Sequence, residues 1–143
     1  MAKATLTQKL DASAAEVWEL IGGFAGICAW HDLVDACDAE EGGSVRRLHN
    51  AGGQGQLVER LLKFDEEAKS YSYTIIGAVD FEAPVVNYLS VLTVTGDGDG
   101  RCTVSWSGSG DPAPGNTEED CIAAWNFIYG TGLKNLAERF GVA

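Results

Sequence analysis

The residues best suited to proton transfer are a glutamate and an arginine on two consecutive strand-like segments. Glu59 lies within residues 56–64 and Arg46 within residues 44–49. Burial of a carboxyl group raises its pKa by desolvation, whereas a nearby arginine lowers it. Such a carboxyl group could move a proton in a dehydration, a cyclisation or a tautomerisation. The same two residues could instead form a structural ion pair on the outer face of a sheet.

The direction in which Glu59 points is ambiguous from the pattern of segment 56–64. Side chains alternate along a strand, so Glu59 shares a face with Leu57 and Leu61. The opposite face is equally apolar, with Val58, Leu62 and Phe64. Either face could therefore be the buried one.

Aromatic side chains recur on the later segments at spacings that give them common faces. The strand pairs that share a face are Tyr73 with Ile75, Tyr88 with Ser90, and Val104 with Trp106. In the C-terminal segment, one helical stripe contains Trp125, Ile128, Tyr129 and Gly132. Apolar and aromatic walls with a few polar groups are typical of a site for a small molecule. The alternative for the helical stripe is an ordinary core.

Two further features, a histidine and a glycine-rich loop, could contribute to such a site. His31, beside Trp30, could bind a ligand anion or act as a base, or it could be a satisfied histidine at the rim. Residues 50–55 read Asn-Ala-Gly-Gly-Gln-Gly, which indicates a flexible loop. This loop could be a lid over a cavity or a plain hairpin connection.

Composition and charge argue against several classes of protein. The chain of 143 residues has a formal net charge of −11, which disfavours nucleic acid and anionic membrane surfaces as partners. No apolar run is long enough to cross a bilayer and no signal-peptide core is visible, so we expect a cytoplasmic protein without membrane insertion. Phosphate-loop, dinucleotide, catalytic-triad and metal motifs are absent, so we expect no cofactor and no metal. The cysteines form no CxxC pair and are expected to be small buried thiols: Cys28, Cys37, Cys102 and Cys121.

The remaining pattern predicts the elements that carry these residues. Strands are expected at 3–9, 33–39, 44–49, 56–64, 70–76, 85–95 and 101–109. A helix is expected at 14–21, where Ser13 and Glu16 can form a capping box, followed by a short helix at 24–29. The long helix at 117–140 would be capped by Asn116 or Thr117. Short turns between strands indicate an antiparallel sheet, so we expect a single α+β domain, residues 1–143, with a curved sheet of seven strands around the C-terminal helix.

Five short strings, in this order and spacing, carry a resemblance to a known superfamily. They are residues 43–46 (GSVR), 58–61 (VERL), 86–88 (VNY), 114–120 (PGNTEED) and 133–137 (LKNLA). Together they resemble the START-like, helix-grip (SRPBCC) superfamily, which includes birch-pollen allergens and the polyketide cyclase/dehydrase-like branch. The similarity is greatest to plant abscisic-acid receptors and lachrymatory-factor-synthase-like proteins. It spans essentially the whole chain and implies a helix-grip fold with a hydrophobic cavity between sheet and helix.

Similarity to the receptors implies roles for several residues. Glu59, Tyr88 and Ser90 match polar residues of the receptor cavity, and His31 replaces the lysine that pairs with the ligand carboxylate. The receptors' Ser-Gly-Leu-Pro-Ala gate is replaced by residues 50–54, and their His-Arg-Leu latch has no counterpart in residues 79–84. These departures argue against an abscisic-acid receptor.

Similarity to the synthase-like proteins implies that an arginine, a glutamate and tyrosines share the cavity. The matching residues in this chain are Arg46, Glu59, Tyr73 and Tyr88. Members of the superfamily include receptors, carriers and enzymes, so the resemblance does not decide the activity.

Three functions are open at this point. The first is binding of a small hydrophobic ligand, aromatic or polyketide-like, by a monomer or homodimer; the second is a cofactor-independent cyclase, dehydratase or isomerase. The catalytic candidates for the second are Glu59, Arg46 and Tyr73. The third is an interaction module whose glycine loop closes on a ligand and recruits a partner. The candidate ligand-binding residues are His31, Leu33, Leu48, Leu61, Ile75, Tyr88, Ser90, Trp106, Trp125, Ile128 and Tyr129.

Overall fold

One antiparallel sheet and one long helix make up most of the computed structural model, which describes residues 1–143. The strands are β1 (Ala2–Leu10), β2 (Val34–Glu40), β3 (Val45–Asn50), β4 (Gln56–Asp65), β5 (Ser70–Val79), β6 (Val85–Gly98) and β7 (Arg101–Pro112). The helices are α1 (Ala14–Ile21), α2 (Glu118–Phe140) and the short 3₁₀ turns η1 (Phe24–Ala29), η2 (Glu41–Gly43) and η3 (Ala51–Gly53). The predicted α+β helix-grip architecture is confirmed.

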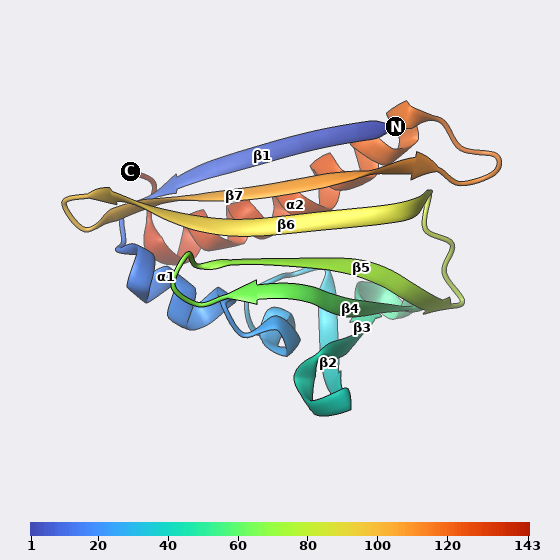
Figure 1. Cartoon of the computed structure of the whole chain (residues 1–143), viewed down its shortest axis with the longest axis horizontal. Coiled ribbons are helices and arrows are strands. Elements are labelled where there is room, and N and C mark those ends of the chain that lie inside the picture. The colour runs from blue at the N-terminus through green and yellow to red at the C-terminus, as the bar shows by residue number, and fades with distance from the viewer.

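The strand order is β1-β7-β6-β5-β4-β3-β2, and every neighbouring pair is antiparallel. The first strand therefore lies beside the last, while α1 and η1 carry the chain to the opposite edge at β2. In Figure 1, α2 runs behind β1, β7 and β6 along their length, and it packs on β1 and β7. The inner face of the sheet and α2 thus face each other across the middle of the molecule.

Both α-helices begin with the caps that the sequence predicts. The Ser13 hydroxyl accepts a hydrogen bond from the Glu16 amide at 3.1 Å, and the Glu16 carboxylate accepts one from the Ser13 amide. In α2 the cap is Thr117 rather than Asn116, and it forms the same reciprocal pair with Asp120. Each cap satisfies amides that the first helical turn leaves free, and a cap of this kind stabilises a helix by about 1 kcal/mol.

A close contact between α2 and the sheet depends on one glycine. A Cβ atom at Gly132 would lie 2.7 Å from both His31 Cδ2 and Trp106 Cζ3. The Trp106 ring stacks on Tyr129, with ring centroids 4.6 Å apart, and it also contacts Trp30. This part of the predicted helical stripe is therefore packed core.

The sheet opens between β5 and β6. These strands pair only over Ser70–Tyr73 and Ser90–Thr93, and beyond that point they diverge (Figure 1). β6 carries a bulge between Val86 and Leu89, where Asn87 adopts a positive φ of 53°. β5 nevertheless continues to Val79, past its predicted end at residue 76, because it still pairs with β4. The resulting gap lies next to the loop at 80–84.

The expectation of four buried thiols is wrong for two of the cysteines. Cys28 in η1 and Cys37 in β2 form a disulfide that joins these two elements. Their nine-residue separation matches no common motif, and only the antiparallel return of the chain brings them together. Cys102 and Cys121 are free and buried, as predicted.

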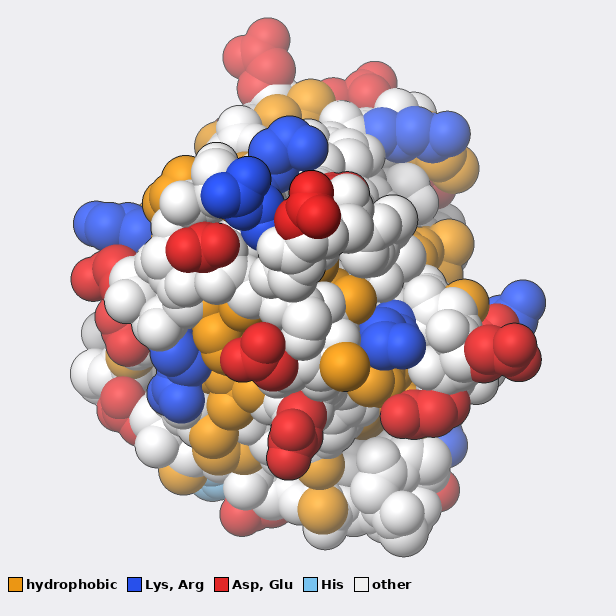
Figure 2. All heavy atoms as spheres, turned by 90° about the vertical axis from the view of Figure 1, so that its left-hand side faces the viewer, with side chains coloured by type: hydrophobic (Ala, Val, Ile, Leu, Met, Phe, Trp, Pro, Cys, Tyr) orange, Lys and Arg blue, Asp and Glu red, His pale blue; other side chains and the backbone are white.

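The surface carries both charges. Figure 2 shows acidic and basic side chains interspersed with small apolar areas on the end of the molecule that contains α1 and the β6–β7 turn. None of the helices is both long and apolar enough to span a membrane.

Candidate functional site

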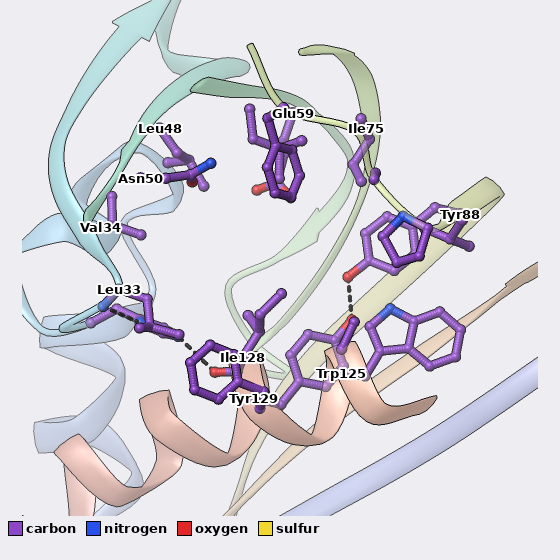
Figure 3. A pocket seen from close by; sticks show the side chains of 18 of the residues that line it. Leu33, Val34, Leu48, Asn50, Glu59, Ile75, Tyr88, Trp125, Ile128 and Tyr129 are labelled. Carbon is purple, nitrogen blue, oxygen red and sulfur yellow. Dashed lines mark hydrogen bonds between the residues drawn. The ribbon is translucent and has the colours of Figure 1, made fainter. Parts of the chain in front are cut away.

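A pocket of about 570 Å³ lies between α2, the inner face of β3 to β6 and the loops at the open end of the sheet. Its volume falls within the range of small-molecule sites, roughly 300–1,000 Å³. Of its 27 lining residues, 18 are hydrophobic, so the few polar side chains stand out as orienting groups. Figure 3 shows Glu59 and Leu48 on one side of the pocket and Trp125, Ile128 and Tyr129 from α2 on the other.

Most of the side chains singled out from the sequence line this pocket. Those are His31, Leu33, Arg46, Leu48, Glu59, Tyr73, Ile75, Tyr88, Trp106, Trp125, Ile128 and Tyr129. Leu61 does not line it, because β4 carries this residue past the pocket, where it packs against the core. Ser90 is also absent from the lining and lies fully buried behind the tyrosines.

Arg46 and Glu59 are a buried cross-strand pair. They are directly opposite each other on β3 and β4, and their side chains are only 1% and 4% exposed. Arg46 reaches Glu59 Oε1 with both Nε (2.8 Å) and Nη2 (2.7 Å), while its Nη1 donates to the Phe24 carbonyl. The rings of Phe24 and Tyr73 cover the guanidinium at 4.1 and 4.5 Å. The pair therefore faces inward, and the alternative of an outer-face ion pair is wrong.

A bulge explains why the alternation on β4 is ambiguous. The register between β4 and β5 shifts between Val58 and Glu59. Because of this shift, two consecutive residues are both buried, Val58 at 8% exposure and Glu59 at 4%. The bulge turns the carboxylate toward the pocket without turning the apolar neighbour out into solvent.

Burial and the ion pair act in opposite directions on Glu59. Desolvation raises the pKa of Glu59, and the charge and hydrogen bonds of Arg46 oppose this without cancelling it. Burial is the largest influence on Arg46 and works against its charge, but Glu59 together with Tyr73 and Tyr71 outweighs burial, so the pKa of Arg46 is raised. Arg46 is therefore a fixed cation that is committed to Glu59.

Four side chains form one hydrogen-bonded network that includes three lining residues and the buried Ser90. Ser90 donates its only proton to the Ser107 carbonyl at 3.1 Å, so its oxygen must accept from Tyr129 (3.0 Å) and from the indole of Trp106 (3.1 Å). The Tyr129 proton is thereby used, so in the hydroxyl–hydroxyl contact Tyr88 is the donor. The oxygen of Tyr88 keeps acceptor capacity on the pocket side (Figure 3).

Trp106 also donates to the Tyr73 hydroxyl at 3.1 Å. The pKa of Tyr73 and Tyr88 is raised by burial, so both remain neutral over the ordinary pH range. Tyr73 therefore contributes a neutral hydroxyl beside the ion pair.

Both ring nitrogens of His31 are engaged by the backbone. The Leu33 amide donates to Nδ1 at 3.2 Å, so the ring proton sits on Nε2, which donates to the Ile128 carbonyl at 2.8 Å. Burial lowers the pKa of His31, although the bond to Ile128 opposes this. His31 thus lines the pocket as a neutral ring that has no nitrogen left for a ligand anion or for base catalysis.

The pocket mouth is built from two loops, of which the sequence analysis singled out only the glycine-rich one as a possible lid. The loop at 80–84 contributes Phe81 and Pro84, and Asn50, Ala51 and Gln54 contribute from the other side. An aromatic residue close to a proline, between two long strands, is the signal that could have identified the first loop.

The glycine-rich loop is held in place at both ends. The Ala51 amide donates to the Leu33 carbonyl at 2.9 Å, and the Gly52 amide donates to Asp35 at 3.2 Å. A Cβ atom at Gly55 would lie 2.4 Å from the Asp80 carbonyl oxygen, so the two loops are in contact at this point. Gly55 also has a positive φ of 89°. Glycine is therefore required at this contact.

No group of three or more His, Cys, Asp or Glu side chains is placed to hold a metal ion. The polar groups at the pocket are carboxylates, amides, hydroxyls and the one engaged arginine. They can accept or donate hydrogen bonds and, at Glu59, exchange a proton.

Known proteins match this chain over nearly its whole length. A family model described as "Polyketide cyclase / dehydrase and lipid transport" matches residues 1–141. The solved structure of the protein XoxI from Bacillus cereus is 35% identical, with a TM-score of 0.91 over 98% of this chain and 96% of that one. An uncharacterised protein from Bacillus thuringiensis is 34% identical, with a TM-score of 0.90 over 97% and 98% of the two chains.

A more distant likeness concerns the fold alone. The di-domain ARO/CYC protein BexL, from the BE-7585A biosynthetic pathway, is 19% identical with a TM-score of 0.80. The match covers 96% of this chain and 46% of BexL.

Proposed function

Because the chain belongs to the polyketide cyclase, dehydrase and lipid transport family, we propose that it binds a small hydrophobic molecule, aromatic or polyketide-like, between the sheet and α2. Membership of this family supports ligand binding or cyclase activity in general. The finer proposal depends on the pocket itself, whose walls are mostly hydrophobic and whose size suits an organic molecule of two or three rings.

The observation that carries this proposal is the place of the aromatic side chains. Trp125 and Tyr129 on α2 contact Tyr88 on the sheet, the first by ring stacking and the second by a hydroxyl–hydroxyl hydrogen bond, so the three rings form one continuous aromatic wall of the pocket (Figure 3). A planar apolar ligand in the pocket would bury its surface against this aromatic wall and against the aliphatic side chains of the remaining lining, at about 25 cal/mol per Å² of apolar area.

The test is to block the pocket from one helix position. Ala124 lines the pocket and its neighbour Ala123 is exposed and does not. We expect Ala124→Trp to lower the affinity for the neutral fluorescent probe N-phenyl-1-naphthylamine by about 10-fold or more, since one ring-sized side chain would occupy its place. Ala123→Trp serves as the matched control and should bind the probe as the unaltered chain does.

Equal binding by all three proteins would contradict the proposal, because the probe would then lie elsewhere. The proposal would also be contradicted if the unaltered chain did not bind the probe at concentrations well above the dissociation constants that are typical of apolar pockets. Thermal unfolding of each variant shows whether the substitution leaves the fold intact.

A second candidate function is cofactor-independent proton transfer, of the kind used in cyclisation or dehydration. The observation that favours it is the buried carboxyl group of Glu59, whose pKa is raised inside an apolar pocket. In this role Glu59 would take a proton from carbon and return it elsewhere on the same molecule, while the Tyr73 hydroxyl donates to the substrate oxygen and Arg46 holds the Glu59 carboxylate in position. The fold likeness to BexL is compatible with this chemistry.

A minimal assay for this second function is hydrogen–deuterium exchange at an acidic carbon. The unaltered chain would speed exchange of the α-protons of 2-tetralone in D₂O, measured by proton NMR, and the double variant Arg46→Met/Glu59→Leu, which removes both charges of the buried pair, would not. Equal rates with the unaltered chain and with this double variant would leave ligand binding as the function of the site.

The proposal extends to the setting of the protein. We place it in the cytoplasm as a monomer or homodimer that has a small molecule as its partner, and neither nucleic acid nor a cofactor. The net charge of −11 supports the exclusion of nucleic acid.

A further inference from the structure

Two oxygen atoms at the pocket, Glu59 Oε2 and the Tyr88 hydroxyl oxygen, are left free as hydrogen-bond acceptors. Glu59 uses only Oε1 for Arg46, and Oε2 accepts no hydrogen bond from the protein. Trp30 Nε1 is the one side-chain polar atom that is both fully buried and without a hydrogen-bond partner. Oε2 has no partner either, so it is not fully buried. Since Glu59 lines the pocket, Oε2 must open onto the pocket space.

A second free acceptor lies on another strand of the pocket wall, β6. The Tyr88 proton is committed to Tyr129 by the chain that ends at the Ser107 carbonyl. The Tyr88 oxygen therefore faces the pocket with an unused lone pair (Figure 3).

The cationic groups at the pocket are not free to receive an anion. Arg46 and His31 are the only basic residues in the lining. Arg46 is held by Glu59, by the Phe24 carbonyl and by two aromatic rings, and the His31 nitrogens are both bonded to the backbone. Two further carboxylates, Glu82 and Asp120, stand at the mouth. An incoming carboxylate or phosphate would thus lose its water without meeting a free cation in the lining.

From these groups we infer that the pocket selects neutral aromatic molecules carrying a hydroxyl or N–H group that donates to Glu59 Oε2, and rejects carboxylates of the same shape. The inference rests on the proposed ligand-binding function and names the class of ligand. Its basis is the open Oε2 atom of a carboxylate whose other oxygen is fixed by Arg46.

The test compares three probes that share one ring system and differ in one group. They are 2-naphthol, which donates a hydrogen bond, 2-methoxynaphthalene, which cannot, and 2-naphthoate, which is an anion. Calorimetric titration at neutral pH should give 2-naphthol a Kd about 10-fold or more below that of 2-methoxynaphthalene, as expected for a hydrogen bond to a charged acceptor. 2-Naphthoate should bind at least about 100-fold more weakly than 2-naphthol.

The variant that assigns the preference to Glu59 removes both charges together. Loss of Glu59 alone would leave Arg46 buried without a partner and could prevent folding. Replacement of a buried ion pair by apolar side chains of similar volume is often neutral for stability, so the double variant Arg46→Met/Glu59→Leu should fold. We expect it to bind 2-naphthol and 2-methoxynaphthalene with Kd values within about 3-fold of each other.

The outcomes separate this inference from the proposed function. A preference for 2-naphthol that disappears in the double variant supports the inference. Equal Kd values for the two neutral probes, tight binding of 2-naphthoate, or an unchanged preference in the double variant would overturn it while ligand binding stands. If none of the three probes binds to the unaltered chain, the inference and the proposed function fail together.

Discussion

At the scale of single residues, the site is decided by which hydrogen-bonding atoms are already engaged. Arg46 and His31 are residue types that often bind anions. In this structure, however, Arg46 donates hydrogen bonds to Glu59 and to the Phe24 carbonyl, and His31 donates to the Ile128 carbonyl. Glu59 keeps one oxygen for a ligand because the two bonds from Arg46 converge on the other. The residue types therefore indicate which side chains can contact a ligand, but the hydrogen bonds within the protein decide which of their atoms remain available to it.

The engaged state of His31 predicts a dependence of stability on pH. Burial holds the pKa of His31 below its ordinary value of 6.5, so in the interval between the two values the unfolded chain binds more protons than the folded one. The stabilisation that depends on neutral His31 is thus complete above pH 6.5 and is lost as the pH falls toward the lowered pKa. The slope is at most about 1.4 kcal/mol per pH unit.

Urea unfolding at several pH values between about 5.5 and 7.5 measures this effect. The stability advantage of the unaltered chain over His31→Asn should shrink as the pH falls. His49→Asn is the matched control, since His49 is more exposed and bonds to Asp38 at the surface. A pH-independent gap between the unaltered chain and His31→Asn would show that His31 does not stay neutral in the fold.

The sequence could predict many of the pocket side chains but not their bonding. Alternation placed Tyr73 and Tyr88 on buried faces, and both are buried. The inward turn of Glu59 depends on a register shift in β4, which the apolar pattern cannot reveal because both faces of that strand are apolar. The tautomer of His31 depends on a carbonyl 97 residues further along the chain.

At the scale of elements, α2 packs closely at Gly132 and more loosely at Gly130. Gly132 touches His31 and Trp106, where a Cβ atom would lie only 2.7 Å from either ring. Gly130, two residues earlier, would place a Cβ atom at an ordinary 3.7 Å from Leu6. The same substitution should therefore have opposite effects at these two positions.

We expect Gly132→Ala to destabilise the protein by about 1–3 kcal/mol, because the added methyl overpacks the contact between helix and sheet. Gly130→Ala should stabilise it by up to about 1 kcal/mol, because alanine favours the helix and the space is sufficient. Chemical denaturation of both variants measures the difference. Stabilisation by both substitutions would mean that α2 lies further from the sheet than described.

The disulfide is the element-scale feature that local sequence could not predict. It links η1 to β2 beside Ile27 and Val34, which line the pocket. A loop of nine residues closed by a disulfide loses chain entropy equivalent to about 2–3 kcal/mol in the unfolded state. The sheet topology brings η1 next to β2, and the spacing of the two cysteines in the sequence does not show this. The prediction of free thiols from spacing alone was therefore wrong for this pair.

Loss of this disulfide should therefore lower stability without changing the fold. We expect Cys28→Ser/Cys37→Ser to unfold at a lower denaturant concentration, by about 2–3 kcal/mol in free energy. The reducing agent dithiothreitol should shift the unaltered chain toward the double variant and leave the variant unchanged. The free thiols Cys102 and Cys121 are buried and serve as an internal control for accessibility. No response of the unaltered chain to reduction would contradict the disulfide.

At the scale of the whole molecule, the fold follows from elements that the sequence predicts well. The two helix caps, the seven strands and the long last helix all appear close to their expected positions. The sequence pattern could not predict the opening of the sheet. β5 and β6 separate after Tyr73, but the residues that follow in both segments still have the pattern of strands. That separation, together with α2, creates the space in which the polar acceptors of Glu59 and Tyr88 face apolar walls.

The measurement that tests the central claim most directly is isotope-filtered NOE spectroscopy of the labelled protein with 2-naphthol. Contacts are predicted from the naphthyl protons to methyl groups of Leu48, Ile75 and Ile128, which line the pocket. The exposed Leu62 and Leu89, which lie outside the pocket lining, should show none. Contacts confined to Leu62 and Leu89, or a bound ligand with no contact to the three pocket residues, would contradict the claim that this chain encloses its ligand between sheet and helix.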